Sequence, residues 1–207
     1  MCQWKIKGGG GGGVAGVELA CLDLLNSDWR DWRCPGRRTD RLEDPEWVRR
    51  FLDRWNLTVP RPMDACASEM LTELRSVLRR LVDDFRSGKP LHREDVARLD
   101  AAMAAAPVCR RLHQEGNRCC LSTEPVSRDW TWVAAEIAAS FADLVECGDP
   151  GRLKACENPE CLWVFYDESR NRSRRWCDAT ECGNLIRVRR FRARQRAVRS
   201  GPKRCAP

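Results

Sequence analysis

The chain has 207 residues, of which 37 are Lys or Arg and 30 are Asp or Glu, and its formal net charge is +7. This length allows one domain with a hydrophobic core and one small additional module. No run of about 18 apolar residues occurs, and the first residues lack the apolar stretch of a secretory signal. We therefore expect a cytoplasmic protein with no membrane partner.

The first 150 residues are predicted to form a mostly helical domain after a leader. Residues 1–15 contain six consecutive glycines and are expected to be a disordered leader. Hydrophobic periodicity predicts helices over residues 17–26, 44–56, 64–85, 93–105 and 129–146. The second of these has a clear start, because Asp44 can cap the helix and Pro45 fits its first turn.

A β-hairpin is predicted between the last two of these helices. Its strands cover residues 108–113 and 118–123, and Gln-Glu-Gly-Asn lies between them as the turn. The sequence Gly-Asp-Pro-Gly at 148–151 then predicts a domain boundary. We therefore expect a domain over 16–150, a module over 151–200 and a tail over 201–207, in an α+β fold.

The N-terminal domain shows little sign of catalytic chemistry. It contains no glycine-rich phosphate loop and no nucleophile elbow, and it holds only two histidines, His92 and His113. We therefore do not expect an enzyme. One loop combines large aromatic and basic side chains, a composition typical of ligand pockets but also of aromatic anchors that pack a loop onto a core. These residues are Trp29, Arg30, Trp32 and Arg33.

The positive charge is concentrated in the last quarter of the chain. Residues 1–150 carry 22 basic and 24 acidic side chains, whereas residues 151–207 carry 15 basic and 6 acidic ones. The C-terminal part alone is therefore expected to have a polyanionic partner.

Four of the thirteen cysteines have the spacing of metal ligands. Cys156 and Cys161 are separated by four residues, as are Cys177 and Cys182, and fifteen residues lie between the two pairs. Two such pairs supply the tetrahedral thiolate set of a structural zinc ion, whose binding would provide on the order of 10 kcal/mol of folding energy. We predict one Zn²⁺ in a treble-clef-like or ribbon-like finger that ends in a basic helix. The other nine cysteines show no ligand spacing and are expected to be buried or incidental surface thiols.

Arginines surround the last cysteine pair and follow it, and no acidic residue occurs from Gly183 to Pro207. Arginine matches phosphate oxygens and guanine edges, so this pattern favours nucleic-acid binding over a merely solvated helix. A seam of Leu185, Val188 and Phe191 is expected to hold the helix to the finger. The predicted nucleic-acid contacts are Arg170, Asn171, Arg172, Arg174, Arg175, Asn184, Arg187, Arg189, Arg190 and Arg194.

The module resembles the CGNR zinc finger of bacterial proteins. The resemblance rests on CENPEC at 156–161, SRNRSRRW at 169–176 and CGN at 182–184. In that family the finger follows a domain called ABATE, which is associated with stress-induced transcription regulation, and residues 17–57 resemble its start. The resemblance implies the same four zinc ligands. One departure stands out, because Leu185 replaces the signature arginine after CGN.

The sequence as a whole favours a DNA-binding transcriptional regulator. In this hypothesis the N-terminal domain senses a small-molecule effector or forms a homodimer, and the finger docks on DNA. An RNA-binding accessory protein is one alternative, because phosphate contacts alone do not select the polymer. An enzyme with its site in the N-terminal domain is the other.

Overall fold

The computed structural model describes residues 19–31 and 37–199, and side chains up to residue 196. The predicted leader, the predicted tail and the loop residues Trp32 and Arg33 lie outside the described residues. None of the helices within the described ranges is long and apolar enough to span a membrane.

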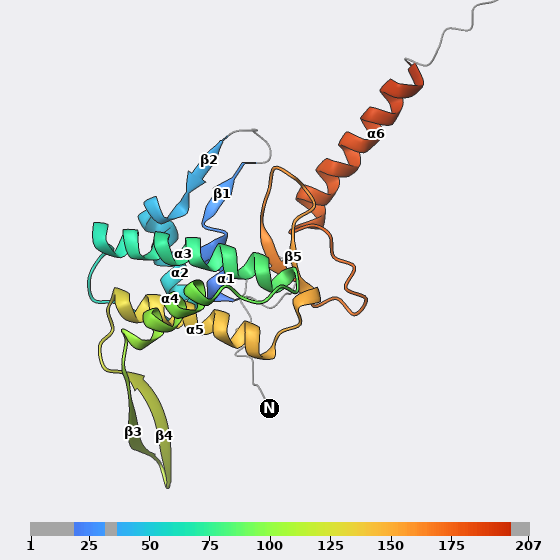
Figure 1. Cartoon of the computed structure of the whole chain (residues 1–207). Coiled ribbons are helices and arrows are strands. Elements are labelled where there is room, and N and C mark those ends of the chain that lie inside the picture. Colours follow the sequence, from blue (N-terminus) through green and yellow to red (C-terminus); the bar gives the residue numbers. More distant parts are fainter. Residues whose placement is uncertain (1–18, 32–36, 200–207) are drawn as a thin grey trace, which may run out of the picture.

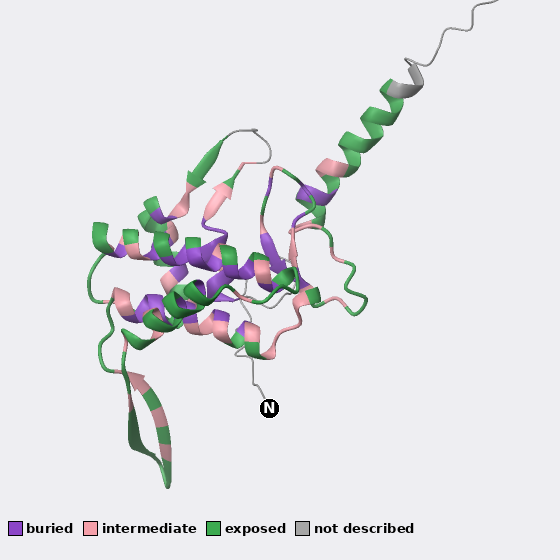
Figure 2. Cartoon of the chain, viewed as in Figure 1, coloured by how far each residue is buried: buried purple, intermediate pink, exposed green. Residues whose placement is uncertain are grey.

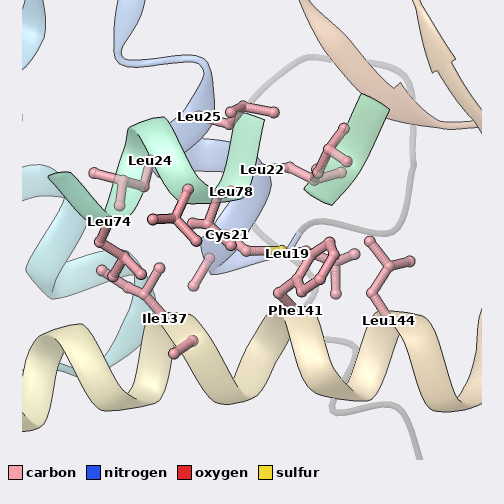
Figure 3. Close-up of a cluster of buried hydrophobic side chains, with 14 of the residues drawn as sticks. Leu19, Cys21, Leu22, Leu24, Leu25, Leu74, Leu78, Ile137, Phe141 and Leu144 are labelled. Atoms are coloured by element: carbon pink, nitrogen blue, oxygen red, sulfur yellow. The ribbon is translucent and has the colours of Figure 1, made fainter. Parts of the chain in front are cut away.

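Five helices build the N-terminal domain (Figure 1): α1 (Ala20–Leu25), α2 (Pro45–Trp55), α3 (Ala65–Arg86), α4 (Arg93–Ala104) and α5 (Trp130–Cys147). Short α1 packs against both α3 and α5. Figure 3 shows the apolar face of α5, with Ile137 and Phe141, directed toward the leucines of α1 and α3. Leu24, Leu78 and Ile137 are fully buried. The predicted mostly helical α+β fold is confirmed.

Three aspartates fix where the longer helices begin. The carboxylates of Asp44, Asp64 and Asp129 accept hydrogen bonds from backbone amides in the first turns of α2, α3 and α5, at 2.8–3.0 Å. Such caps satisfy amides that have no partner inside the helix. The helix start predicted at Asp44-Pro45 is confirmed by α2, which begins at Pro45.

The predicted hairpin is present and longer than expected. Strands β3 (Val108–Glu115) and β4 (Arg118–Pro125) pair antiparallel along their whole length. Gly116, with φ of 61°, lies in the connecting turn, and this left-handed conformation allows a connection of only two residues. The hairpin projects from the helical body (Figure 1). A second pair, β1 (Asp28–Arg30) with β2 (Arg38–Asp40), occupies part of the segment that was expected to be a loop.

The last part of the chain forms a ribbon and a projecting helix. Strands β5 (Leu153–Ala155) and β6 (Val164–Tyr166) pair antiparallel, and α6 (Asn184–Arg199) extends away from the rest of the molecule (Figure 1). Short helical turns η1 (Arg41–Glu43), η2 (Pro150–Arg152) and η3 (Ala179–Gly183) connect the elements.

The ribbon and the helical domain share one hydrophobic core. Leu153, Val164 and Tyr166 belong to the same buried cluster as the leucines of α1 and α3. The side-chain amide of Asn26, at the end of α1, pairs with the backbone of Val164: its Nδ2 donates to the Val164 carbonyl at 2.8 Å, and its Oδ1 accepts from the Val164 amide at 2.9 Å. Both residues are buried, so this pair of bonds fixes the ribbon against α1.

Candidate metal centre and nucleic-acid interface

The four cysteines of the predicted site converge on one point. Cys156 follows β5 and Cys161 precedes β6, whereas Cys177 and Cys182 lie just before α6. The Cys177 sulfur lies 3.6 Å from those of Cys161 and Cys182, and all four sulfurs are within 4.8 Å of one another. A tetrahedral zinc ion with bonds of about 2.3 Å separates its sulfur ligands by about 3.8 Å. The four thiols therefore fit one tetrahedral metal ion.

Asn158 organises the first cysteine pair. It is fully buried, its carbonyl accepts from the Cys161 amide at 2.9 Å, and its Nδ2 donates to the Cys182 sulfur at 3.5 Å. A donor to a ligand sulfur orients that ligand and stabilises its thiolate form. The sequence alone does not reveal this role of Asn158, because the donor–sulfur contact spans 24 positions.

The second pair is held by a capped turn and a packed glycine. The Asp178 carboxylate accepts from the amides of Thr180 and Glu181 at 2.7 and 2.9 Å, which starts the turn that carries Cys182. A β-carbon at Gly183 would lie 2.9 Å from Cδ1 of Trp176. Glycine at this position thus lets the indole pack against the start of α6.

The four thiols strongly shift one another's pKa values. Hydrogen bonds from Cys161 and Cys177 lower the pKa of Cys156 to about 2. Hydrogen bonding to Cys156 and Cys161, together with burial, raises the pKa of Cys177 far above its ordinary value. Several thiolates at this separation repel one another, and a divalent cation between them removes that cost. With four protein ligands and no open position, the site has the composition of a structural zinc site.

A buried aspartate shapes the arginine-rich loop that joins the two pairs. Asp167 is fully buried and accepts from Lys154 Nζ at 2.7 Å, the Ser169 amide at 2.9 Å and the Arg174 amide at 3.0 Å. Burial alone would raise its pKa, but these hydrogen bonds lower the pKa of Asp167 to about 2. The carboxylate is therefore ionised at neutral pH and holds residues 169–174 in place.

The predicted contact residues of this loop differ in how they are placed. The Arg174 guanidinium lies 4.3 Å from the Phe165 ring centroid and donates to the carbonyls of Trp176 and Cys177, so it is committed to the finger itself. Arg172 pairs with Asp149 at 2.7 Å, and Arg175 pairs with Glu157. Arg170 and Asn171 are exposed.

The basic helix is exposed from Arg187 to Arg196, the last residue whose side chain is described (Figure 2). Its predicted contact residues Asn184, Arg187, Arg189, Arg190 and Arg194 are all exposed, and Arg189 lies 3.7 Å from Glu160. The predicted seam is wrong beyond its first member. Leu185 packs against the cysteine cluster, but Val188 and Phe191 are 37% and 56% exposed, because α6 leaves the finger after its first turn.

Trp29, which lies on β1, takes part in the junction between the two regions. The Arg41 guanidinium lies 5.4 Å from the Trp29 ring and 5.5 Å from the Trp163 ring of the finger, so it bridges two aromatic side chains. Arg30 is exposed. A cleft with a volume of about 560 Å³ lies elsewhere, between η1, α2, the start of α3 and Trp130. A ligand pocket at Trp29–Arg33 therefore stays a prediction.

Comparison with known families agrees with this geometry. Residues 18–148 match the ABATE family, described as "Putative stress-induced transcription regulator", and residues 152–195 match the CGNR zinc finger. Neither family description names an enzymatic activity. No curated protein matches the chain. The four clustered cysteines are thus one zinc site, and the expected zinc cofactor is confirmed. Since the ABATE match covers more than half of its length, the chain belongs to the ABATE family and carries a CGNR zinc finger at its C-terminal side.

Proposed function

We propose that this chain is a transcriptional regulator whose finger presents α6 to DNA. The observation that carries the proposal is α6 itself, an exposed helix with seven arginines and no acidic residue. A helix with side chains is about 10–12 Å across, and the major groove of B-DNA is about 12 Å wide. Because α6 projects from the body (Figure 1), it can enter a groove without steric conflict from the helical domain.

One face of α6 is suited to base or phosphate contacts. Arg187, Arg190 and Arg194 follow one another at steps of three and four residues and therefore share one side of the helix. Arg170, exposed on the loop beside the metal, is placed to contact a flanking phosphate. Arg174 is better assigned to the folding of the finger, since its guanidinium is already occupied by carbonyls and Phe165.

Isolated α6 carries a substantial internal repulsion. Several arginines of α6 are three or four positions apart and therefore neighbours on the helix surface. Each such like-charge pair destabilises a helix by about 0.2–0.5 kcal/mol. The pairs include Arg187 with Arg190, Arg190 with Arg194, and Arg192 with Arg196. Phosphate groups would neutralise this repulsion. Binding to DNA is therefore expected to stabilise the helical form of α6.

The test is titration of the zinc-loaded full-length chain with random-sequence duplex DNA, followed by circular dichroism and by hydrogen exchange. We expect binding that weakens steeply with salt and an increase of helical signal with slower exchange in residues 184–199. Competition with duplex and single-stranded RNA distinguishes the alternative partner. Equal or tighter binding to RNA would favour the RNA-binding accessory protein, and no binding to either polymer would refute the proposal.

We further propose that the N-terminal domain senses a small molecule and that this molecule binds in the cleft beside η1. Its walls are largely apolar and include Leu42, Val48, Leu52, Val59, Met63 and Trp130. Its volume of about 560 Å³ is in the range of small-molecule sites. Leu42 directly follows Arg41, which contacts the finger through Trp163, so a ligand that moves η1 would also move this contact.

A screen of small apolar and aromatic compounds by thermal shift would test this placement. A compound that occupies the cleft is expected to raise the Tm of the chain and to change its duplex affinity. The Val59→Arg variant, which fills the cleft, should lose both effects. Compounds whose effects survive in that variant would place the site elsewhere. Dimerisation, the other role expected for this domain, stays a prediction.

A further inference from the structure

A second group of metal-ligating side chains lies on the β3–β4 hairpin, far from the finger (Figure 1). His113 and Cys120 are directly opposite each other in the strand register, so their side chains share one face. Glu115 is two residues after His113 on the same strand and therefore on the same face. The ligand atoms of these three residues all lie within 4.8 Å of one another.

The separations between these side chains are close to those between the ligands of a tetrahedral ion. His113 Nε2 lies 3.4 Å from one carboxylate oxygen of Glu115, and Cys120 Sγ lies 3.7 Å from the other. Zinc bonds are about 2.1 Å to nitrogen and oxygen and about 2.3 Å to sulfur. Tetrahedral angles then place nitrogen and oxygen about 3.4 Å apart, and sulfur and oxygen about 3.6 Å apart. The two distances end on different oxygens of the Glu115 carboxylate, so a rotation of that group would bring one oxygen to an ion that His113 and Cys120 also reach.

The orientation of the Glu115 carboxylate is a second indication that these three side chains act together. Arg118 is directly opposite Glu115 in the register and is the natural ion-pair partner of its carboxylate. Within the described residues the structure records no ion pair between them. The carboxylate lies instead against His113 and Cys120. The three potential ligands therefore lie together, although the guanidinium of Arg118 is available to the Glu115 carboxylate.

We propose that His113, Glu115 and Cys120 form a second metal site, for Zn²⁺ or a similar borderline divalent ion. Imidazole nitrogen, carboxylate oxygen and thiolate sulfur are all zinc ligands, and three protein ligands leave the fourth position open to water or another small ligand. On binding, the Cys120 thiol loses its proton to solvent and the metal–sulfur bond replaces the sulfur–hydrogen bond.

This site differs from the finger in its metal affinity and in the effect that the metal has on the structure. His113 and Glu115 are 43% and 69% exposed, and only three protein ligands are present, so it binds less tightly than the four-cysteine site. An isolated two-stranded hairpin is marginally stable in water. The metal links the two strands across the register and therefore makes the projecting hairpin more rigid.

The experiment uses reduced full-length protein with its finger zinc in place, titrated with Co²⁺. Cobalt reports tetrahedral coordination by its visible absorption and thiolate ligation by its near-ultraviolet absorption. We expect one equivalent of Co²⁺ per chain beyond the finger zinc, with slower hydrogen exchange in residues 108–125. His113→Ala and Cys120→Ser should each weaken this binding more than about 100-fold, since loss of a group that only orients a ligand already costs about 10–100-fold.

Cys119→Ser is the matched control, because Cys119 pairs with Gln114 and lies on the opposite face of the same strand. It should retain the additional equivalent. All three variants should keep one zinc and an unchanged Tm without added metal, since the hairpin is largely exposed and contributes little to the core. Absence of a second equivalent in the natural chain, or its retention in both His113→Ala and Cys120→Ser, would overturn the proposal.

Discussion

Replacing Cys177 by serine is expected to release the zinc and to destabilise the whole chain, not the finger alone. The finger ribbon supplies Leu153, Val164 and Tyr166 to the main core, so loosening the ribbon removes packing from the helical domain. Structural zinc contributes on the order of 10 kcal/mol of folding energy. A change of 1 kcal/mol shifts the Tm of a chain of this size by about 2–4 °C, so Tm should fall by at least about 10 °C.

Metal analysis and hydrogen exchange measure this outcome. Exchange should accelerate in residues 152–183 and also at the end of α1, where Asn26 bonds to Val164. Cys66→Ser is the control, because Cys66 is exposed at the start of α3 and far from the cluster in sequence and contacts. If Cys177→Ser kept one zinc per chain, or lost it without any change in exchange, the assigned site would be wrong.

Neutralising the face of α6 that carries Arg187, Arg190 and Arg194 is expected to produce the largest loss of DNA affinity. In a triple variant, Arg187, Arg190 and Arg194 are each replaced by glutamine, which keeps a long side chain and a good helix former. Each lost phosphate contact lowers the log–log salt slope by about 0.9. Three contacts lower it by about 2.7, which corresponds at about 0.1 M salt to an affinity loss of several hundred-fold.

The control variant removes the same charge from another projecting element. Arg110, Arg111 and Arg118 lie on the exposed β3–β4 hairpin and can also be replaced by glutamine. If general positive charge caused the binding, both triple variants would lose affinity alike. We expect a large loss for the α6 variant and a change of less than about threefold for the hairpin variant. An α6 variant with unchanged affinity and slope would show that the helix is only a solvated surface.

Local signals predicted the helices and the zinc site well. The Asp44-Pro45 start of α2 and the apolar stripe of α3 depend on residues a few positions apart, and such patterns are readable from sequence. The spacing of Cys156, Cys161, Cys177 and Cys182 likewise reflects a property of the metal itself.

The features that the sequence did not reveal depend on distant contacts. Arg174 was expected to face phosphates, and only the positions of Phe165 and Asp167 show that its side chain and backbone are held within the finger. The cleft combines η1, α2 and Trp130, which are far apart along the chain.

The register of the β3–β4 pair also could not be predicted from the sequence. A four-residue turn would have paired His113 with Arg118, whereas the two-residue turn at Gly116 pairs His113 with Cys120. This shift of the register by two residues on β4 is what assembles the proposed hairpin site.

The bonds between Asn26 and Val164 limit how the two functional regions can communicate. A regulator can transmit a signal by rigid-body movement of a DNA-binding domain on a flexible linker. Such a movement needs a domain interface that separates without exposing a hydrophobic core. Here the ribbon is continuous with the packing of α1 and α3, so swinging it away would open that core to water. If the helical domain senses a ligand as proposed, the signal would reach α6 through small repacking steps, such as movement of Arg41 between Trp29 and Trp163. In the proposed regulator, a ligand would therefore act by changing the contacts at this junction and not by changing the orientation of a domain.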